Sequence, residues 1–180
     1  MFPHIDEKDV ARFLYCLSIL EQNVFQFYKC LHEKVEHPLV KSLLLYVAYD
    51  SQKHSVILSE LGENTANLEW KVGDCERELG VVWKTVVSLS KEISKEENFD
   101  DKKLLSLVNR LTDFENVIGE EYVTLVQLKH LEFIVKEMPK IHGIDLDILK
   151  VIFEKITEDE EGHKELLVLV KGFLQEKLAS

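Results

Sequence analysis

Two short stretches of the sequence place an acidic residue four positions before a histidine. They are DSQKH, residues 50–54, and DEEGH, residues 159–163. In the second, Glu160 also stands three residues before His163, whereas the first has Ser51 in the matching place. A glutamate and a histidine three apart on a helix point the same way, so one helix face offers a carboxylate oxygen and an imidazole nitrogen together. Such a ligand pair suits iron, manganese or zinc.

The composition bounds the classes of protein to which the chain can belong. It has 180 residues, 46% of them hydrophobic, and a net charge of −11 without a basic cluster. We expect one domain with a sizeable core. Nucleic acid and anionic membranes are disfavoured as partners because both require clustered Lys and Arg. No apolar run approaches the roughly 18 residues of a membrane span. The N-terminus MFPHIDEKDV is charged where a signal peptide has its apolar core, so we expect a cytoplasmic protein.

The three cysteines, Cys16, Cys30 and Cys75, form no CxxC pair and are odd in number. We therefore expect neither a disulfide nor a cysteine-based zinc site. Cys16 and Cys30 lie in an amphipathic helical pattern, which predicts buried thiols.

Helical periodicity dominates the rest of the chain. From about residue 7 to 36, hydrophobic residues recur at spacings of three and four. Pro38 cannot continue this helix but suits the first turn of a second one. The further expected segments are a helix at about 39–61, a loop at 62–75, a shorter helix at about 76–94, a long helix from about 100 to 137 capped by Asp100 or Asp101, and a last helix from 145 or 147.

No segment alternates in the manner of a strand, so the predicted fold is all-α. The whole chain, 1–180, is expected to form one domain of two antiparallel helical hairpins, at about 7–61 and 100–177. A crossover at about 62–99 joins them and holds the extra helix.

The two hairpins repeat one pattern. The first long helix carries ExxVxxFY from Glu21 to Tyr28, and its counterpart carries ExxIxxEY from Glu115 to Tyr122. In each, the tyrosine follows the glutamate by seven residues, two turns along the same face. The returning helices carry the two acid-and-histidine stretches.

The heights of these residues in the hairpins also match. In an antiparallel hairpin, residues at equal height are equidistant from the turn. Glu21 and Ser51 are centred on position 36, beside Pro38, and Glu115 and Glu160 are centred beside Pro139. We therefore expect five candidate ligands to converge in the interior: Glu21, His54, Glu115, Glu160 and His163. Burying several carboxylates without a cation is costly, which favours a metal ion among them.

This pattern resembles the ferritin-like superfamily and, within it, the rubrerythrin-like branch. Its members carry a Glu on each of two helices and a Glu-x-x-His on each of the other two. The run from Glu21 through Tyr28, then VEHPLVKSLL, then an acidic run ending in His54, looks like the first hairpin of that branch. The second hairpin matches through Glu115, Tyr122, Glu160 and His163.

The resemblance implies a ferritin-like four-helix bundle with a di-iron site. Glu21 and Glu115 would be terminal ligands, and the two Glu-x-x-His glutamates would bridge the ions. Glu160 can bridge, but Ser51 is neutral and too short to replace the other bridge. Asp50 is adjacent, yet one residue turns roughly 100° around a helix, so Asp50 should point away unless a π-bulge intervenes. Tyr28 and Tyr122 would donate hydrogen bonds that orient the carboxylates.

By the same resemblance, the chemistry would be oxidation of Fe(II) by dioxygen or reduction of peroxide. One or two iron ions are expected, with manganese and zinc as alternatives. Rubrerythrins carry a rubredoxin-like part with two CxxC pairs, which this chain lacks, so electrons would come from a separate donor. A homodimer is expected by analogy with such bundles.

The rival hypothesis is a ferritin-like bundle that has lost stable metal binding and acts as an interaction or assembly module. Ser51 favours this rival, and retention of the other five ligand-type residues favours the metalloprotein. Iron storage in a cage is a weaker third hypothesis, because nothing in the sequence identifies cage-forming surfaces.

Overall fold

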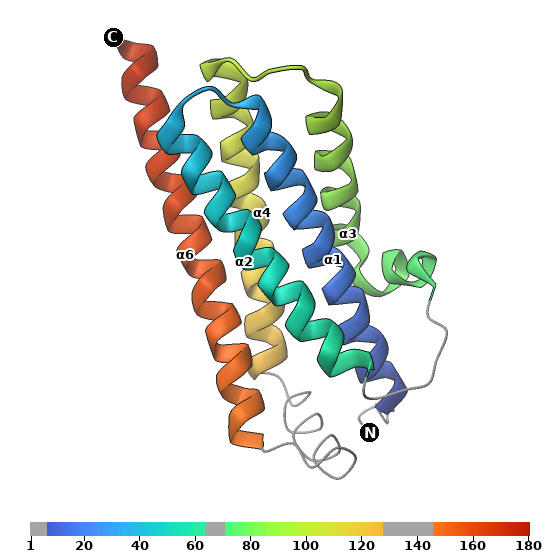
Figure 1. Cartoon of the computed structure of the whole chain (residues 1–180). Helices are drawn as coiled ribbons and strands as arrows, with labels where there is room; N and C mark the ends of the chain where they lie inside the picture. Colours follow the sequence, from blue (N-terminus) through green and yellow to red (C-terminus); the bar gives the residue numbers. More distant parts are fainter. Residues whose placement is uncertain (1–6, 64–70, 128–145) are drawn as a thin grey trace.

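The computed structural model describes residues 7–63, 71–127 and 146–180, and this part of the chain is helical without a strand. Its helices are α1 (Glu7–Lys34), α2 (Pro38–Glu63), α3 (Val72–Lys95), α4 (Asp101–Gln127) and α6 (Leu146–Ala179). α1 packs along α2 and α4 packs along α6, each pair running antiparallel, and α3 lies against α1 (Figure 1). The all-α prediction is confirmed for the described residues. The predicted end of the fourth helix and the turn after it lie outside them.

The apolar stripe of α1 forms one wall of the core. Its buried members recur at three- and four-residue spacings, as one face of an amphipathic helix requires: Leu14, Leu17, Leu20, Val24, Phe27 and Leu31. Phe27 packs edge-on against Phe114 of α4 with ring centroids 5.9 Å apart. This contact joins the two hairpins through the interior.

Specific residues fix the start of α2 and the end of α1. α2 begins at Pro38, whose missing N–H costs nothing in the first turn of a helix. Lys34, at the end of α1, donates to the carbonyl of Ile93 at 2.6 Å, near the end of α3. A cation there stabilises the partial negative charge of a helix C-terminus.

The start of α4 is capped by Asp100, which accepts a hydrogen bond from the backbone N–H of Lys103 at 2.8 Å.

The crossover helix differs from its expected form. α3 begins at Val72, earlier than the predicted 76, and α2 ends at Glu63, two residues beyond the predicted end. α3 is also kinked at Gly80, where φ is +51° and ψ is −113°. That backbone conformation is open to glycine at little cost because glycine has no Cβ. The kink separates a first segment, residues 72–79, from the remainder of α3.

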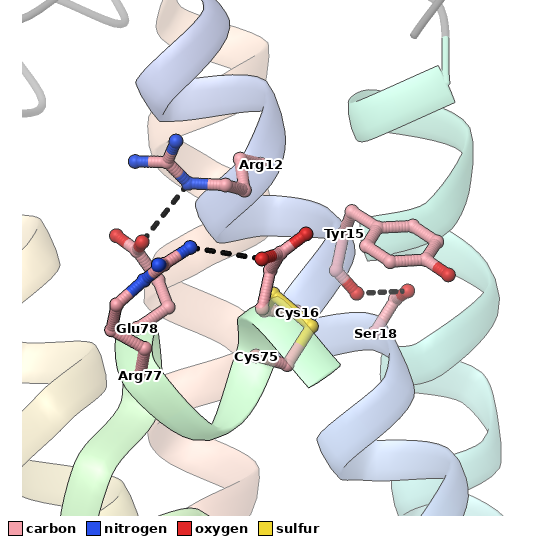
Figure 2. The surroundings of a disulfide bond; sticks show 8 residues. Arg12, Tyr15, Cys16, Ser18, Cys75, Arg77 and Glu78 are labelled. Atoms are coloured by element: carbon pink, nitrogen blue, oxygen red, sulfur yellow. Dashed lines mark hydrogen bonds and ion pairs between the residues drawn. A yellow bond between two sulfur atoms is a disulfide. The ribbon is translucent and has the colours of Figure 1, made fainter. Parts of the chain in front are cut away.

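The first segment of α3 is tied covalently to α1 by a Cys16–Cys75 disulfide, with the two Cα atoms 5.1 Å apart (Figure 2). The expectation of no disulfide was wrong. The two cysteines are 59 residues apart, and only the packing of α3 back onto α1 brings them together. Cys16 is fully buried as expected, but as half of the disulfide rather than as a thiol. Cys30 is the free cysteine, and its side chain is only partly buried, so the prediction of a buried thiol there was wrong.

Two features bear on location. Among the described helices, none has an apolar stretch of the length and hydropathy needed to cross a bilayer. The disulfide matters as well, since disulfides persist mainly in oxidising compartments and in the cytosol are mostly transient or redox-sensing.

We predict that reducing the Cys16–Cys75 bond destabilises the chain. A cross-link closing a loop of 59 residues removes denatured-state entropy corresponding to roughly 4 kcal/mol at most. The free energy of unfolding, measured with urea with and without reductant, should therefore fall by about 2–4 kcal/mol. The Cys30→Ser variant is the matched control and should show the same fall. A thiol count on the denatured, unreduced wild type should find Cys30 alone; three free thiols would contradict the assignment.

Candidate metal centre

The structure brings the five candidate ligands together in the interior of the bundle. They come from four helices, and each is at most 3% exposed: Glu21 from α1, His54 from α2, Glu115 from α4, and Glu160 and His163 from α6. Helical periodicity explains their orientation. Glu21 lies among Leu17, Leu20 and Val24 on the buried stripe of α1, so its carboxylate enters the core with them.

These residues form two groups that share one carboxylate. The first is Glu21, His54 and Glu160, and the second is Glu115, Glu160 and His163. Within each group the candidate ligand atoms lie within 4.8 Å of one another. Glu160 contributes to both because its two oxygens diverge: Oε1 lies 3.0 Å from Nδ1 of His54, and Oε2 lies 3.6 Å from Nδ1 of His163. The geometry therefore offers two adjacent metal positions with Glu160 between them.

Several inward-facing atoms of the cluster lack a hydrogen-bond partner. Among the described residues these include Nδ1 of His54, Nδ1 of His163 and Oε1 of Glu160. Nδ1 of His54 and Oε1 of Glu160 are close, but they are not aligned for a hydrogen bond. Buried polar atoms are almost always satisfied, so three such atoms within two adjacent groups need an explanation. A cation that accepts their lone pairs would supply one.

The outward-facing nitrogens of the histidines are held by aspartates in a crossed arrangement. Nε2 of His54, on α2, lies 3.1 Å from Oδ2 of Asp159 on α6. Nε2 of His163, on α6, lies 3.3 Å from Oδ2 of Asp50 on α2. An aspartate that accepts from Nε2–H leaves Nδ1 as the lone-pair nitrogen of a neutral ring. Both imidazoles are thereby oriented to present Nδ1 to the centre.

Lys53 joins these two aspartates. Its ammonium lies 2.7 Å from Asp50 and 2.8 Å from Asp159, so it balances part of their charge at the surface end of the cluster. We did not predict Lys53 or Asp159 as site residues. A signal for Asp159 was present in the sequence, because each histidine follows an aspartate by four residues. The sequence does not reveal that each aspartate contacts the histidine of the other helix.

The other predicted positions are also located. The Tyr28 hydroxyl, which is fully buried, donates to Oε1 of Glu115, as expected for an orienting donor. Ser51 is buried on α2 at the position that matches Glu160. α2 is regular α-helix through residues 50–54, and Asp50 contacts His163 from outside rather than replacing the missing bridge. The side chain of Tyr122 lies outside the described residues.

Burial and charge together shift the pKa values of the cluster. Burial lowers the pKa of His54, but the Glu160 contact and the Glu21 charge outweigh it and raise the value to about 9. His163 is shifted in the same direction, since Asp50, Glu115 and Glu160 outweigh its burial and raise its pKa. Burial raises the pKa of Glu160, but both histidines overcome this and lower it to about 2. For Glu115, burial dominates and raises the pKa. Without a metal ion, protons on the two imidazoles balance the buried carboxylates.

Comparisons of the chain with protein-family models, with curated proteins and with solved structures each found no match. The assignment of a function therefore depends on the residues of this chain and their geometry.

We predict that Asp159 controls the metal affinity of His54 without touching the metal. The Asp159→Ala substitution removes the acceptor for Nε2–H, which should weaken Zn(II) binding by roughly 10–100-fold. Nitrogen NMR of His54 should show loss of the tautomer with its proton on Nε2. Glu158→Ala is the matched control, since Glu158 is an exposed carboxylate of the same helix paired with Lys155. Equal affinities of the two variants would contradict the role of Asp159.

We predict that the metal-free protein loses stability as pH rises from about 6.5 to about 9. A folded-state pKa near 9 for His54, above its ordinary value of 6.5, contributes stability that is present below pH 6.5 and lost through pH 9. The low pKa of Glu160 acts at the other end, where stability is lost as pH falls below about 4.5 toward 2.

Thermal unfolding with a chelator present should therefore show a lower Tm at pH 9 than at pH 6. The His54→Gln variant should lose part of that difference. Zn(II) should reduce it, because a metal ion replaces the proton on Nδ1. A Tm that rises from pH 6 to pH 9 in the metal-free wild type would rule out this charge balance.

Proposed function

We propose that this chain is a rubrerythrin-related, ferritin-like metalloprotein that binds one or two transition metal ions, most simply iron. The observation that carries the proposal is a set of three buried candidate ligand atoms that have no hydrogen-bond partner and lie among carboxylates. They are Nδ1 of His54, Nδ1 of His163 and Oε1 of Glu160. A purely structural cluster would place its hydrogen-bond donors against its acceptors. Here the outward nitrogens of both rings are paired with aspartates, and the inward nitrogens lie in two adjacent groups that share Glu160.

The donor set suits iron. Carboxylate oxygen with imidazole nitrogen is a combination that iron, manganese and zinc all accept. Glu21 and Glu115 would be terminal ligands, Glu160 would be shared, and each ion would take one imidazole. When bound, two ferrous ions would together supply two electrons to dioxygen, which with two protons gives hydrogen peroxide; reduction of peroxide is the alternative reaction of the same centre.

The residues of the chain have separate tasks in this proposal. Asp50 and Asp159 pair with Nε2 of the two imidazoles and hold the rings turned so that Nδ1 faces the centre. The Tyr28 hydroxyl holds Glu115 in place. Its pKa is raised well above the usual value, chiefly by burial and then by the Glu115 charge, so the hydroxyl retains its proton. The surrounding apolar side chains exclude water and strengthen the electrostatic interactions among these groups.

Charge balance bears on the number of ions. Two divalent ions bring four positive charges to the three inner glutamates, Glu21, Glu115 and Glu160. A fourth carboxylate at position 51 would complete the balance, and Ser51 does not provide it. Two ions therefore need one further anion, such as hydroxide, whereas one ion does not. A second ion is accordingly bound more weakly than the first.

The rival function, a bundle that no longer binds metal and acts as an interaction module, also has an observation in its favour. Ser51 removes one bridging ligand, and protonated His54 and His163 can balance the buried carboxylates without a cation. A buried ion-pair network of this kind is tolerated only where charges are paired. Metal titration separates the two functions directly.

We predict that metal-stripped wild-type protein binds one or two Fe(II) ions under anaerobic conditions, and that exposure to dioxygen then produces ferric absorption. Glu160→Gln should abolish most of this binding, because the shared carboxylate serves both positions, while circular dichroism should show unchanged helicity. Glu161→Gln is the matched control, since Glu161 is the exposed neighbour on α6.

Ser51→Glu extends the same titration. Restoring the missing carboxylate should raise the ion count toward two and tighten the weaker position. If wild type refuses iron, zinc and manganese alike, the interaction-module function replaces the one proposed. If Glu160→Gln and Glu161→Gln bind equal amounts of iron, Glu160 is not a ligand.

A further inference from the structure

The first segment of α3, residues 72–79, is held by packing much less than the rest of that helix. Among its described side chains, those of residues 74–79, that of Cys75 alone is fully buried. After the kink the buried side chains recur about once a turn and anchor the helix in the core: Val82, Trp83, Val86, Leu89 and Ile93. The two parts of α3 are therefore attached to the bundle in different ways.

The non-covalent contacts of the first segment with α1 are weak. The Arg12–Glu78 ion pair spans 3.0 Å, but its side chains are 30% and 25% exposed, and an ion pair of this exposure contributes little to stability (Figure 2). Leu79 is only partly buried against the core. The principal tie between the segment and α1 is therefore the Cys16–Cys75 bond itself.

Gly80 supplies a hinge at the end of the segment. Its φ of +51° and ψ of −113° already break the helix there. A Cβ at this glycine would meet no atom within 4 Å, so the backbone is not hemmed in by neighbouring side chains. Hinges are short stretches that absorb a change in φ and ψ while the elements on either side keep their structure. The first segment can thus move while the remainder of α3 stays packed.

We propose that the Cys16–Cys75 bond is a redox-controlled latch, which a dithiol reductant opens so that the first segment of α3 detaches from α1 about Gly80. The inference goes beyond the proposed function and does not depend on a metal ion. The free cysteine, Cys30, takes no part in it, because positions 16 and 30 of one helix are roughly 21 Å apart.

The electrons come from the reductant. One thiolate of the dithiol attacks a sulfur of the Cys16–Cys75 bond, that bond breaks, and a mixed disulfide forms. The second thiolate of the reductant then displaces the cysteine. The reductant leaves as a disulfide, having given up two electrons and two protons, and Cys16 and Cys75 remain as two thiols. Both sulfurs are buried, so access depends on fluctuation of the weakly anchored first segment.

Detachment would uncover one face of α1. Glu78 and Leu79 line a small pocket together with Leu17 and Leu20 of α1, so this side of the pocket leaves with the segment. Leu17 precedes Glu21 by one helical turn. The redox state of a single bond would thereby control solvent exposure of α1 beside the candidate metal centre.

The first test asks whether the folded chain can be reduced. Metal-free Cys30→Ser protein, in which Cys16 and Cys75 are the remaining cysteines, is incubated with dithiothreitol at neutral pH without denaturant. Free thiols are then alkylated and counted by mass. Two alkylated thiols are expected, with the helicity of the bundle retained by circular dichroism. A bond that stays closed until urea unfolds the chain would overturn the proposal.

The second test locates the effect by hydrogen exchange on metal-free protein before and after reduction. Exchange at the amides of residues 76–79 should accelerate by about tenfold or more beyond any change at residues 82–93, which follow global stability. The Cys16→Ser/Cys75→Ser double variant should match the reduced chain, and oxidised Cys30→Ser should match the oxidised wild type. Glu78→Gln should accelerate exchange at 76–79 further in the reduced chain alone.

Acceleration by the same factor at both ranges would show a loss of global stability without local release, and no acceleration at 76–79 would show that other contacts hold the segment. Either result would overturn the latch. Neither test involves a metal ion, so failure of the latch leaves the proposed function standing, and failure of metal binding leaves the latch standing.

Discussion

Three carboxylates, those of Glu21, Glu115 and Glu160, are buried in the core of the helical bundle. Ionised carboxylates there are costly unless positive charge accompanies them, and this constraint governs the rest of the site. Four helices contribute to meeting that requirement. Without a metal ion, protonated His54 and His163 supply the charge, which accounts for the raised pKa of each ring. A divalent cation would supply the same charge and release those protons. Under the proposed function, a metal ion and protons would therefore compete for the same atoms.

The crossed aspartates orient the two buried histidines. Asp50 and Asp159 each contact the histidine of the opposite returning helix, so the two hairpins hold each other's histidine in place. Lys53 bridges the aspartates, and this limits the negative charge that would otherwise accumulate beside the cluster. The pattern is nearly symmetric about Glu160. Ser51, which is buried on α2, breaks that symmetry by placing a neutral hydroxyl where a fourth carboxylate would stand.

α3 introduces a second asymmetry between the hairpins. It packs mainly against α1, and its first segment is fixed there by the Cys16–Cys75 bond. The kink at Gly80 separates that segment from the rest of α3. The crossover is therefore more than a connection between hairpins. Leu79 and Val82 of α3 line a small pocket together with residues of α1 and α4.

The sequence by itself determined the features that depend on local periodicity. The three- and four-residue spacing of apolar residues predicts α1, Pro38 marks the start of α2, and the repeated glutamate and histidine pattern identifies the five candidate ligands. Height in an antiparallel hairpin follows from distance to the turn, so their convergence was predictable too. Only the tertiary structure decided the disulfide, the crossed Asp–His pairs and the small pocket. Each of these depends on how separate helices rotate and pack against one another, and no spacing along a single helix records that.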